Sequence, residues 1–149
     1  MLLTIILTLI FSTNPADPDR EDLLIFNSSH SVEVTAEKLA GILNDAGMNV
    51  FTIINHQKGA ESIDAELRPT RVMLFGNPRA GTPLMQCSQT IGIDLPQKAL
   101  MWEDERGNVW LAFNNPRYLG ERHKISEQCE SQLDNAHTAL NRFGKSATE

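Results

Sequence analysis

Apolar residues recur along the chain with two different periods, and the switches between them mark the expected elements. Short runs rich in branched and aromatic side chains predict β-strands at residues 23–26, 50–54 and 71–75. Two further runs, at residues 99–103 and 109–113, flank a polar stretch that contains Gly107. This arrangement predicts a β-hairpin.

A longer period predicts helices at residues 31–46 and 126–143. Apolar residues recur there three or four positions apart and give each segment one apolar face. These residues are Ala36, Leu39, Ala40 and Leu43 in the first segment, and Cys129, Leu133, Ala136, Leu140 and Phe143 in the second. Ser31 is a typical N-cap, and Gly47 suits the left-handed position that follows a helix.

Two shorter helices are predicted from capping signals. Thr82 followed by Pro83 is typical of an N-cap and a first helical residue, so a short helix is expected at residues 84–90. Asn115 followed by Pro116 repeats the pattern and predicts a turn of helix that leads to His123. The resulting order is β-α-β-β-(short α)-β-β-α. It predicts an α+β fold in which helices pack on one face of an antiparallel sheet.

The predicted hairpin is apolar on both faces. Leu100 and Trp102 lie on one face of its first strand, and Ala99 and Met101 lie on the other. A strand with one solvated face should alternate apolar with polar residues. We therefore expect the second face to meet a partner subunit or an apolar ligand, and a homodimer is the commoner solution.

Length and charge restrict the class of protein. The chain has 149 residues, which suits one domain with a short extension. Its formal net charge is −6, and the sequence has no cluster of lysine and arginine. A protein that follows a nucleic-acid backbone needs a basic surface. No nucleic-acid partner is therefore expected.

The N-terminus predicts export. Residues 2–11 form an apolar run that is shorter than the roughly 20 residues needed to cross a bilayer. Such a run is typical of a secretory signal, which we place at residues 1–16, and predicts a periplasmic or secreted protein. An uncleaved anchor, the expected route to a membrane, and a misassigned start remain alternatives.

Two cysteines, Cys87 and Cys129, have two possible roles. In an exported protein they can form a disulfide that closes a loop of about 40 residues and contributes roughly 3–4 kcal/mol. Otherwise they are small buried apolar residues. Their spacing matches no metal-binding or haem-attachment motif.

Several segments together resemble one known family. The stretch FGNPRAGTPLMQCSQTIGIDLPQKALMWEDERGNVWLAFNNPRYLGERH, with INHQKGA and LRPTRVMLFGN upstream, is similar to the family called domain of unknown function 302. The resemblance covers about residues 30–123. It implies an often exported bacterial or archaeal domain of unsettled function. It also implies a β-α-β4-α topology like that of the TATA-binding protein, without a DNA role, and usually a homodimer.

The resemblance also divides the chain into segments, and it shows where this sequence differs from the family. A lead-in at residues 17–29 holds the first strand, and residues 124–149 supply the last helix and a polar tail. The family usually has Asp where this chain has Asn55 and Asn115, and Tyr where it has Phe113. These changes each remove an ionisable group or a hydroxyl.

Two groups of residues are candidates for binding or chemistry. His56 and His123 are both retained in the family pattern, and imidazole titrates near neutrality and binds metals. The loop at residues 76–82 precedes a predicted helix, so its N–H groups and Arg79 suit an anion. The full candidate set is His56, Gly76, Asn77, Arg79, Gly81, Thr82, Trp102, Asn114, Tyr118 and His123. Each can instead have only a structural role.

Four functional hypotheses follow. The first is a homodimeric module that binds a small apolar or anionic molecule. The second is an enzyme, such as a hydrolase or isomerase, with His56 and His123 as acid and base and the N–H groups of Gly81 and Thr82 as anion donors. The third is a structural or interaction subunit. The fourth is a soft-metal or haem binder that uses these histidines with Met73, Met85, Met101 and Cys87.

Overall fold

The computed structural model describes residues 20–149, and its centre is a five-stranded antiparallel sheet. The predicted signal segment at residues 1–16 lies outside the described residues. The strands are β1 (Leu23–Ser28), β2 (Asn49–Asn55), β3 (Thr70–Gly76), β4 (Gln97–Glu103) and β5 (Val109–Asn114). Their order across the sheet is β1-β5-β4-β3-β2, so β1 pairs with the last strand while the other four form a meander.

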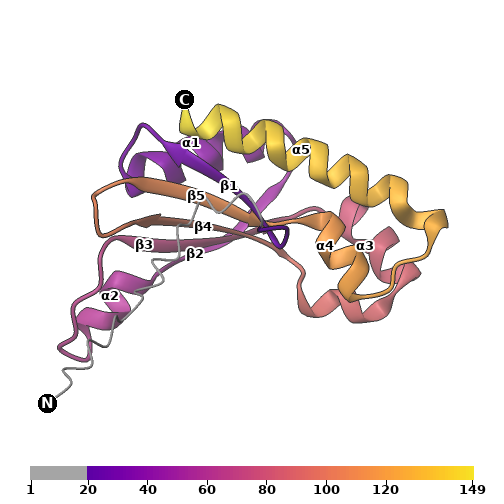
Figure 1. The fold of residues 1–149 in the computed structure, drawn as a ribbon, viewed down its shortest axis with the longest axis horizontal. Helices are drawn as coiled ribbons and strands as arrows, with labels where there is room; N and C mark the ends of the chain where they lie inside the picture. The colour runs from indigo at the N-terminus through magenta and orange to yellow at the C-terminus, as the bar shows by residue number, and fades with distance from the viewer. Residues whose placement is uncertain (1–19) are drawn as a thin grey trace, which may run out of the picture.

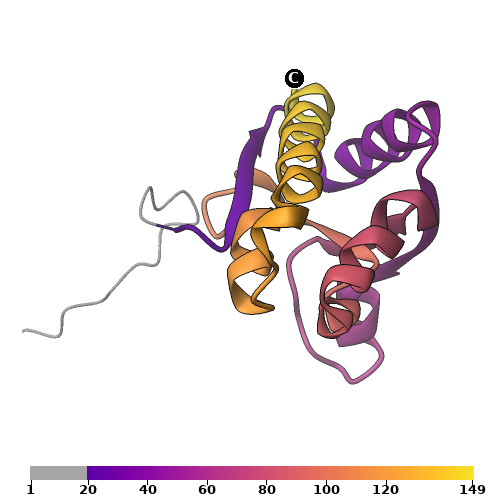
Figure 2. The same ribbon diagram turned by 90° about the vertical axis from the view of Figure 1, so that its right-hand side faces the viewer.

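Residues 20–149 contain five α-helices, which lie on one face of this sheet and beyond its ends. They are α1 (Val32–Asp45), α2 (His56–Glu61), α3 (Pro78–Cys87), α4 (Pro116–Arg122) and α5 (Glu130–Thr148). Two short 3-10 helices, η1 (Gln89–Ile93) and η2 (Glu127–Cys129), follow α3 and precede α5. Figure 1 shows α1 and α5 lying along one face of the sheet, α2 beyond one end, and α3 and α4 beyond the other. Figure 2 shows α1 and α5 side by side.

The α+β class and the β-α-β4-α topology are as predicted. All five predicted strands are present, and both long helices pack on the same face of the sheet. Ser31 caps α1, because its hydroxyl accepts a hydrogen bond from the N–H of Val34. Gly47 has a φ of +74°, the left-handed conformation expected after a helix.

The start of α3 was predicted wrongly. The helix begins at Pro78 rather than after Thr82, because the amide oxygen of Asn77 accepts the N–H of Arg79. Asn77-Pro78 and Thr82-Pro83 are equivalent cap-then-proline signals, and the earlier one follows directly on the end of β3. Pro83 therefore lies inside the helix, where it has no N–H to donate to the carbonyl of Arg79.

Two further helical segments were missed by the prediction. Asn55 caps α2, because its side-chain oxygen accepts a hydrogen bond from the N–H of Lys58. The aspartate that is usual in the family at this position could cap the helix in the same way. The last helix, α5, continues to Thr148, five residues beyond its predicted end. One side of its last turns is buried, and the hydroxyl of Thr148 donates to the carbonyl of Gly144.

The main core lies between the sheet and the two long helices. From the sheet it contains Met73, Phe75, Ala99, Met101, Leu111 and Phe113, and from the helices Leu39, Leu43, Leu140, Phe143 and Ala147. Phe113 packs edge-on against both Phe26 and Phe75, with ring centroids about 6 Å apart. A second, smaller cluster of Leu84, Ile91, Leu119 and Leu133 joins α3, η1, α4 and α5.

The opposite face of the sheet carries an apolar row that crosses all five strands. The register aligns Ile25, Ala112, Leu100, Val72 and Ile54. Trp102 and Trp110 lie beside this row and stack with ring centroids 6.5 Å apart. Within residues 20–149, the helices that lie along the sheet are both on the other face. We call the residues of this row, together with the two tryptophans, the open face.

A disulfide joins Cys87 at the end of α3 to Cys129 in η2, with a Cα–Cα distance of 6.5 Å. Of the two roles considered for these cysteines, the structure has the disulfide. The bond connects α3 to the start of α5 across 42 residues of sequence. It therefore restrains the relative position of these two helices.

Removing the disulfide is expected to lower the free energy of unfolding by about 3–4 kcal/mol, because the unfolded chain regains the entropy of an open loop. Denaturant unfolding of a Cys87→Ala, Cys129→Ala double variant measures the loss. A reducing agent should bring the wild type to the same stability and leave the double variant unchanged. A wild type whose midpoint is insensitive to reduction would contradict the assignment.

Two glycine substitutions should change stability in opposite directions. A Cβ at Gly144 would lie 2.4 Å from the ring of Phe26, so Gly144→Ala should destabilise the protein by about 1–3 kcal/mol through overpacking. A Cβ at Gly41 meets nothing within 4 Å, so Gly41→Ala in α1 should stabilise by about 0.5–1 kcal/mol. Thermal unfolding measures both. Equal effects would contradict the packing of α5 on β1.

Candidate functional site

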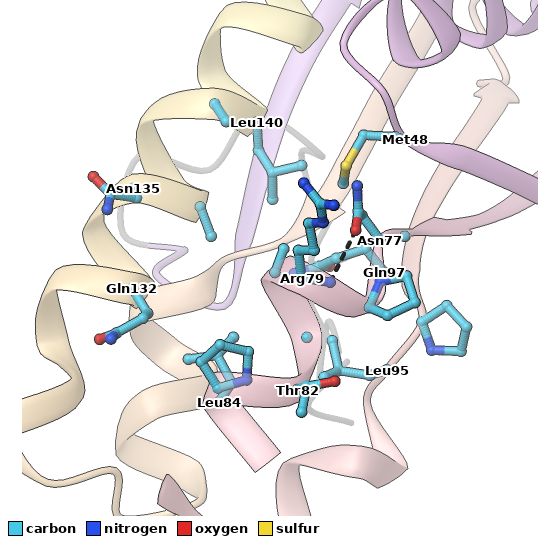
Figure 3. A pocket seen from close by; sticks show the side chains of 18 of the residues that line it. Met48, Asn77, Arg79, Thr82, Leu84, Leu95, Gln97, Gln132, Asn135 and Leu140 are labelled. Atoms are coloured by element: carbon cyan, nitrogen blue, oxygen red, sulfur yellow. Dashed lines mark hydrogen bonds between the residues drawn. The ribbon is translucent and has the colours of Figure 1, made fainter. Parts of the chain in front are cut away.

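A large cavity lies between α3 and α5, beside the ends of β2, β3 and β4. Its volume is about 680 Å³, within the usual range for small-molecule sites. Apolar side chains form most of its wall: Met48, Phe51, Leu84, Met85, Leu95, Ala136, Ala139, Leu140 and Phe143. Figure 3 shows side chains from α3 and α5 facing each other across this space.

The cavity has few polar side chains, and none of them is negatively charged. Arg79 and Arg142 line the cavity together with Asn77, Thr82, Gln97, Gln132 and Asn135. None of the 24 lining residues is Asp, Glu, His, Cys, Lys or Tyr. The cavity therefore has positive side chains but no group that titrates near neutral pH.

Five of the ten predicted site residues line this cavity. They are Gly76, Asn77, Arg79, Gly81 and Thr82, which all belong to the loop singled out from the sequence. The other five, His56, Trp102, Asn114, Tyr118 and His123, are not among the lining residues. The loop residues thus form one wall of the cavity, and the second group of predicted residues lies outside it.

The predicted use of backbone N–H groups at this loop is wrong. The N–H of Arg79 donates to the Asn77 side chain, and those of Ala80 and Gly81 donate to the Asn77 carbonyl. Thr82 lies within α3 rather than at its start. Because Asn77 already binds the free donors of the first turn, only the guanidinium group of Arg79 remains as an anion partner at this end of the helix.

His56 and His123 do not form a pair. His56 follows β2, and His123 ends α4, which follows β5. Three strand spacings of about 4.8 Å separate β2 from β5. The two helices also lie beyond opposite ends of the sheet (Figure 1). The acid–base pair required by the enzyme hypothesis is therefore not present.

His123 instead has a structural environment. Its Nε2 lies 2.5 Å from Asp94 and its Nδ1 lies 3.0 Å from the hydroxyl of Thr90. The imidazole is only 6% exposed, and Arg122 also contacts Asp94 at 3.3 Å. The hydroxyl of Ser88 donates to the His123 carbonyl. These bonds attach the end of α4 to η1, and so support the smaller apolar cluster.

The remaining predicted site residues lie elsewhere on the surface. Trp102 belongs to the open face, where it stacks on Trp110. Asn114 ends β5 and is aligned with Leu23 of β1. Tyr118 lies on α4 and is 41% exposed. None of these side chains reaches the cavity between α3 and α5.

In the described part of the chain, two titratable groups outside the cavity have shifted pKa values. The indole N–H of Trp110 donates to Asp104 at 2.8 Å, and this bond, with smaller contributions from Asn108 and Arg106, lowers the pKa of the Asp104 carboxyl. Partial burial lowers the pKa of His137, with a further contribution from Arg117. Asp104 thus fixes the orientation of Trp110 at the hairpin turn, whereas His137 favours its neutral form.

The soft ligands proposed for a metal or haem do not come together. Met73 and Met101 are fully buried in the main core. Met85 lines the cavity, and Cys87 is in the disulfide. No cluster of three or more His, Cys, Asp or Glu residues suited to a metal occurs within residues 20–149.

The sequence did not reveal the second wall of the cavity. Ala136, Leu140 and Phe143 were predicted to lie on one apolar face, which the structure confirms. Nothing in their spacing indicates that part of that face borders a cavity. Gln97 and Arg142 were also missed, because neither belongs to a recognisable motif.

Comparison with known proteins identifies the family and the fold. A family described as "Domain of unknown function DUF302" matches residues 24–143, a wider range than the resemblance over residues 30–123. The crystal structure of an uncharacterised conserved DUF302 protein from Bacillus stearothermophilus superimposes with a TM-score of 0.78 at 14% identity, covering 86% of this chain and 99% of that one. At this identity the likeness shows the fold alone.

Similar curated proteins are longer than this chain. "Fluoride-specific ion channel FluC 1" of Brucella suis is 48% identical over 103 residues, which are 69% of this chain and 41% of that protein. The Brucella abortus protein of the same name matches equally, over 38% of its length. The chain thus spans about two fifths of these relatives. Among residues 20–149, no helix has the length and hydropathy to cross a bilayer. Because the family match extends over most of the chain, the protein belongs to the DUF302 family.

Proposed function

We propose that this protein is a small-molecule-binding module whose site is the cavity between α3 and α5. The observation that carries the proposal is the cavity itself, with a volume of about 680 Å³ and mainly apolar walls. Small-molecule sites are typically clefts of about 300–1,000 Å³ with mainly apolar walls and a few polar groups. The size and the lining of this cavity therefore fit a binding site.

The walls of the cavity are held by bonds that need no ligand. Asn77 caps α3 at one end and also donates to the carbonyl of Gly47. The disulfide restrains the other end of the same helix. A site that is already ordered loses less conformational entropy when it binds, which favours affinity.

Binding is a better explanation of this cavity than catalysis. Its only ionisable side chains are Arg79 and Arg142, and arginine stays protonated at all relevant pH values. General acid–base or nucleophilic catalysis requires a group that can exchange a proton or attack a substrate. The Thr82 hydroxyl also lines the cavity, but no general base lies there to activate it. The cavity can therefore hold and orient a molecule, while its own side chains provide no acid, base or activated nucleophile.

A second part of the proposal concerns oligomeric state and location. The open face presents an apolar row across five strands, and Ile54 at its edge is 45% exposed. Such a surface is commonly buried by a second copy of the same chain. The disulfide suits an oxidising compartment, in agreement with the expected export signal. We therefore propose an exported homodimer that pairs through the open face.

Filling the cavity should weaken ligand binding. N-phenyl-1-naphthylamine, a neutral fluorescent apolar probe, should bind the wild type with increased fluorescence. Replacing both Ala136 and Ala139 by Met adds apolar volume inside the cavity and should raise the Kd at least about tenfold. Ser146→Met, at an exposed position on the same helix, is the control and should bind normally. A double variant that binds the probe as tightly as the wild type would contradict the proposed site.

Placing a charge on the open face should separate the dimer. Leu100 lies in the middle of the apolar row, and burying an unpaired lysine in an interface costs several kcal/mol. Leu100→Lys should raise the dimer dissociation constant more than about 100-fold, as measured by light scattering across a concentration series. Ile63→Lys changes an exposed apolar residue outside the row and should remain dimeric. A monomeric wild type would contradict this part of the proposal.

A further inference from the structure

The charge around the cavity differs in sign from that of the whole protein. The chain carries a formal net charge of −6 and 19 acidic residues. The cavity, by contrast, is lined by two arginines and no acidic residue. The arginines at positions 20, 71, 117 and 122 each bind a carboxylate, whereas Arg79 and Arg142 form no ion pair within residues 20–149.

Arg79 is placed to meet a ligand inside the cavity. Its backbone is fixed by the bond from its N–H to the side chain of Asn77. Its side chain extends from α3 toward Leu140 and Met48 on the facing wall (Figure 3). A guanidinium group binds a carboxylate or sulfonate through parallel N–H···O bonds, and these are stronger than bonds between neutral groups.

Arg142 adds positive charge on the α5 side of the cavity. Its guanidinium carbon lies 5.3 Å from the centre of the Phe143 ring, within the range of a cation–π contact. Both residues line the cavity, so this arginine lies against an apolar wall rather than beside an acid. Positive groups therefore border the cavity from both helices.

From these observations we infer the ligand class, an inference that rests on the proposed function. The ligand is an amphipathic organic anion with a single carboxylate or sulfonate head that binds Arg79 in the field of Arg142. Its apolar body lies against Leu84, Leu95 and Leu140. An inorganic anion alone would leave most of the apolar wall without a partner.

Two fluorescent probes with the same ring system test whether the cavity prefers an anionic ligand. N-phenyl-1-naphthylamine is neutral, and 1-anilinonaphthalene-8-sulfonate adds one sulfonate to the same body. The wild type should bind the sulfonate about tenfold more tightly, despite its negative net charge, because a charge-assisted bond is gained. Equal affinities would overturn the inference and leave the proposed function standing. Failure of both probes to bind would overturn both.

Substitutions of single arginines test which residue causes the preference for the sulfonate probe. Arg79→Gln should raise the Kd for the sulfonate about tenfold and change the Kd for the neutral probe less than about twofold. Arg106→Gln removes the same charge at the exposed hairpin turn, outside the cavity, and should change neither Kd. An Arg79→Gln variant that keeps the full preference for the sulfonate would overturn the role of Arg79. Thermal unfolding of each variant tests whether the fold is retained.

Discussion

The position of α5 is the constraint on which the rest of the structure depends. A helix of 19 residues is about 28 Å long, considerably longer than the strands it crosses. Its C-terminal half packs on the sheet, where Gly144 allows the ring of Phe26 to approach. Its N-terminal half extends past the sheet and contacts α4 through Leu133 and Gly120. The cavity lies at the transition, where α5 leaves the sheet and faces α3.

This arrangement leaves two apolar surfaces with different shapes on the two sides of the sheet. The cavity between α3 and α5 is concave, bordered by arginines and sized for a small molecule. The open face is a broad surface formed by strand side chains that extends across the whole sheet. A concave site suits a ligand and a broad face suits another protein surface. The two proposals therefore concern separate surfaces and can be tested independently.

Local capping signals predicted the helices and strands well. Where two signals for a helix start were equivalent, the sequence could not decide which one the chain uses. The cap at Ser31, the left-handed Gly47 and the cap at Asn115 act over four residues or fewer, and all are present. The start of α3 was predicted wrongly because Asn77-Pro78 and Thr82-Pro83 carry the same signal. The end of β3 at Gly76 decided between them, since the chain turns away from the sheet there.

The sequence by itself determined the strands, the long helices, the apolar second face of the hairpin and the loop that forms one wall of the cavity. These features depend on residues close together in the chain, whose spacing fixes which side chains share a face. Only the tertiary structure decided that His56 and His123 lie apart, that Cys87 binds Cys129, and that Gln97 and Arg142 border the same cavity as Arg79. The histidines lie apart because of the strand order, whereas the other two relations arise where α5 and the segment before it pack beside α3. These contacts join residues distant in sequence and leave no local pattern.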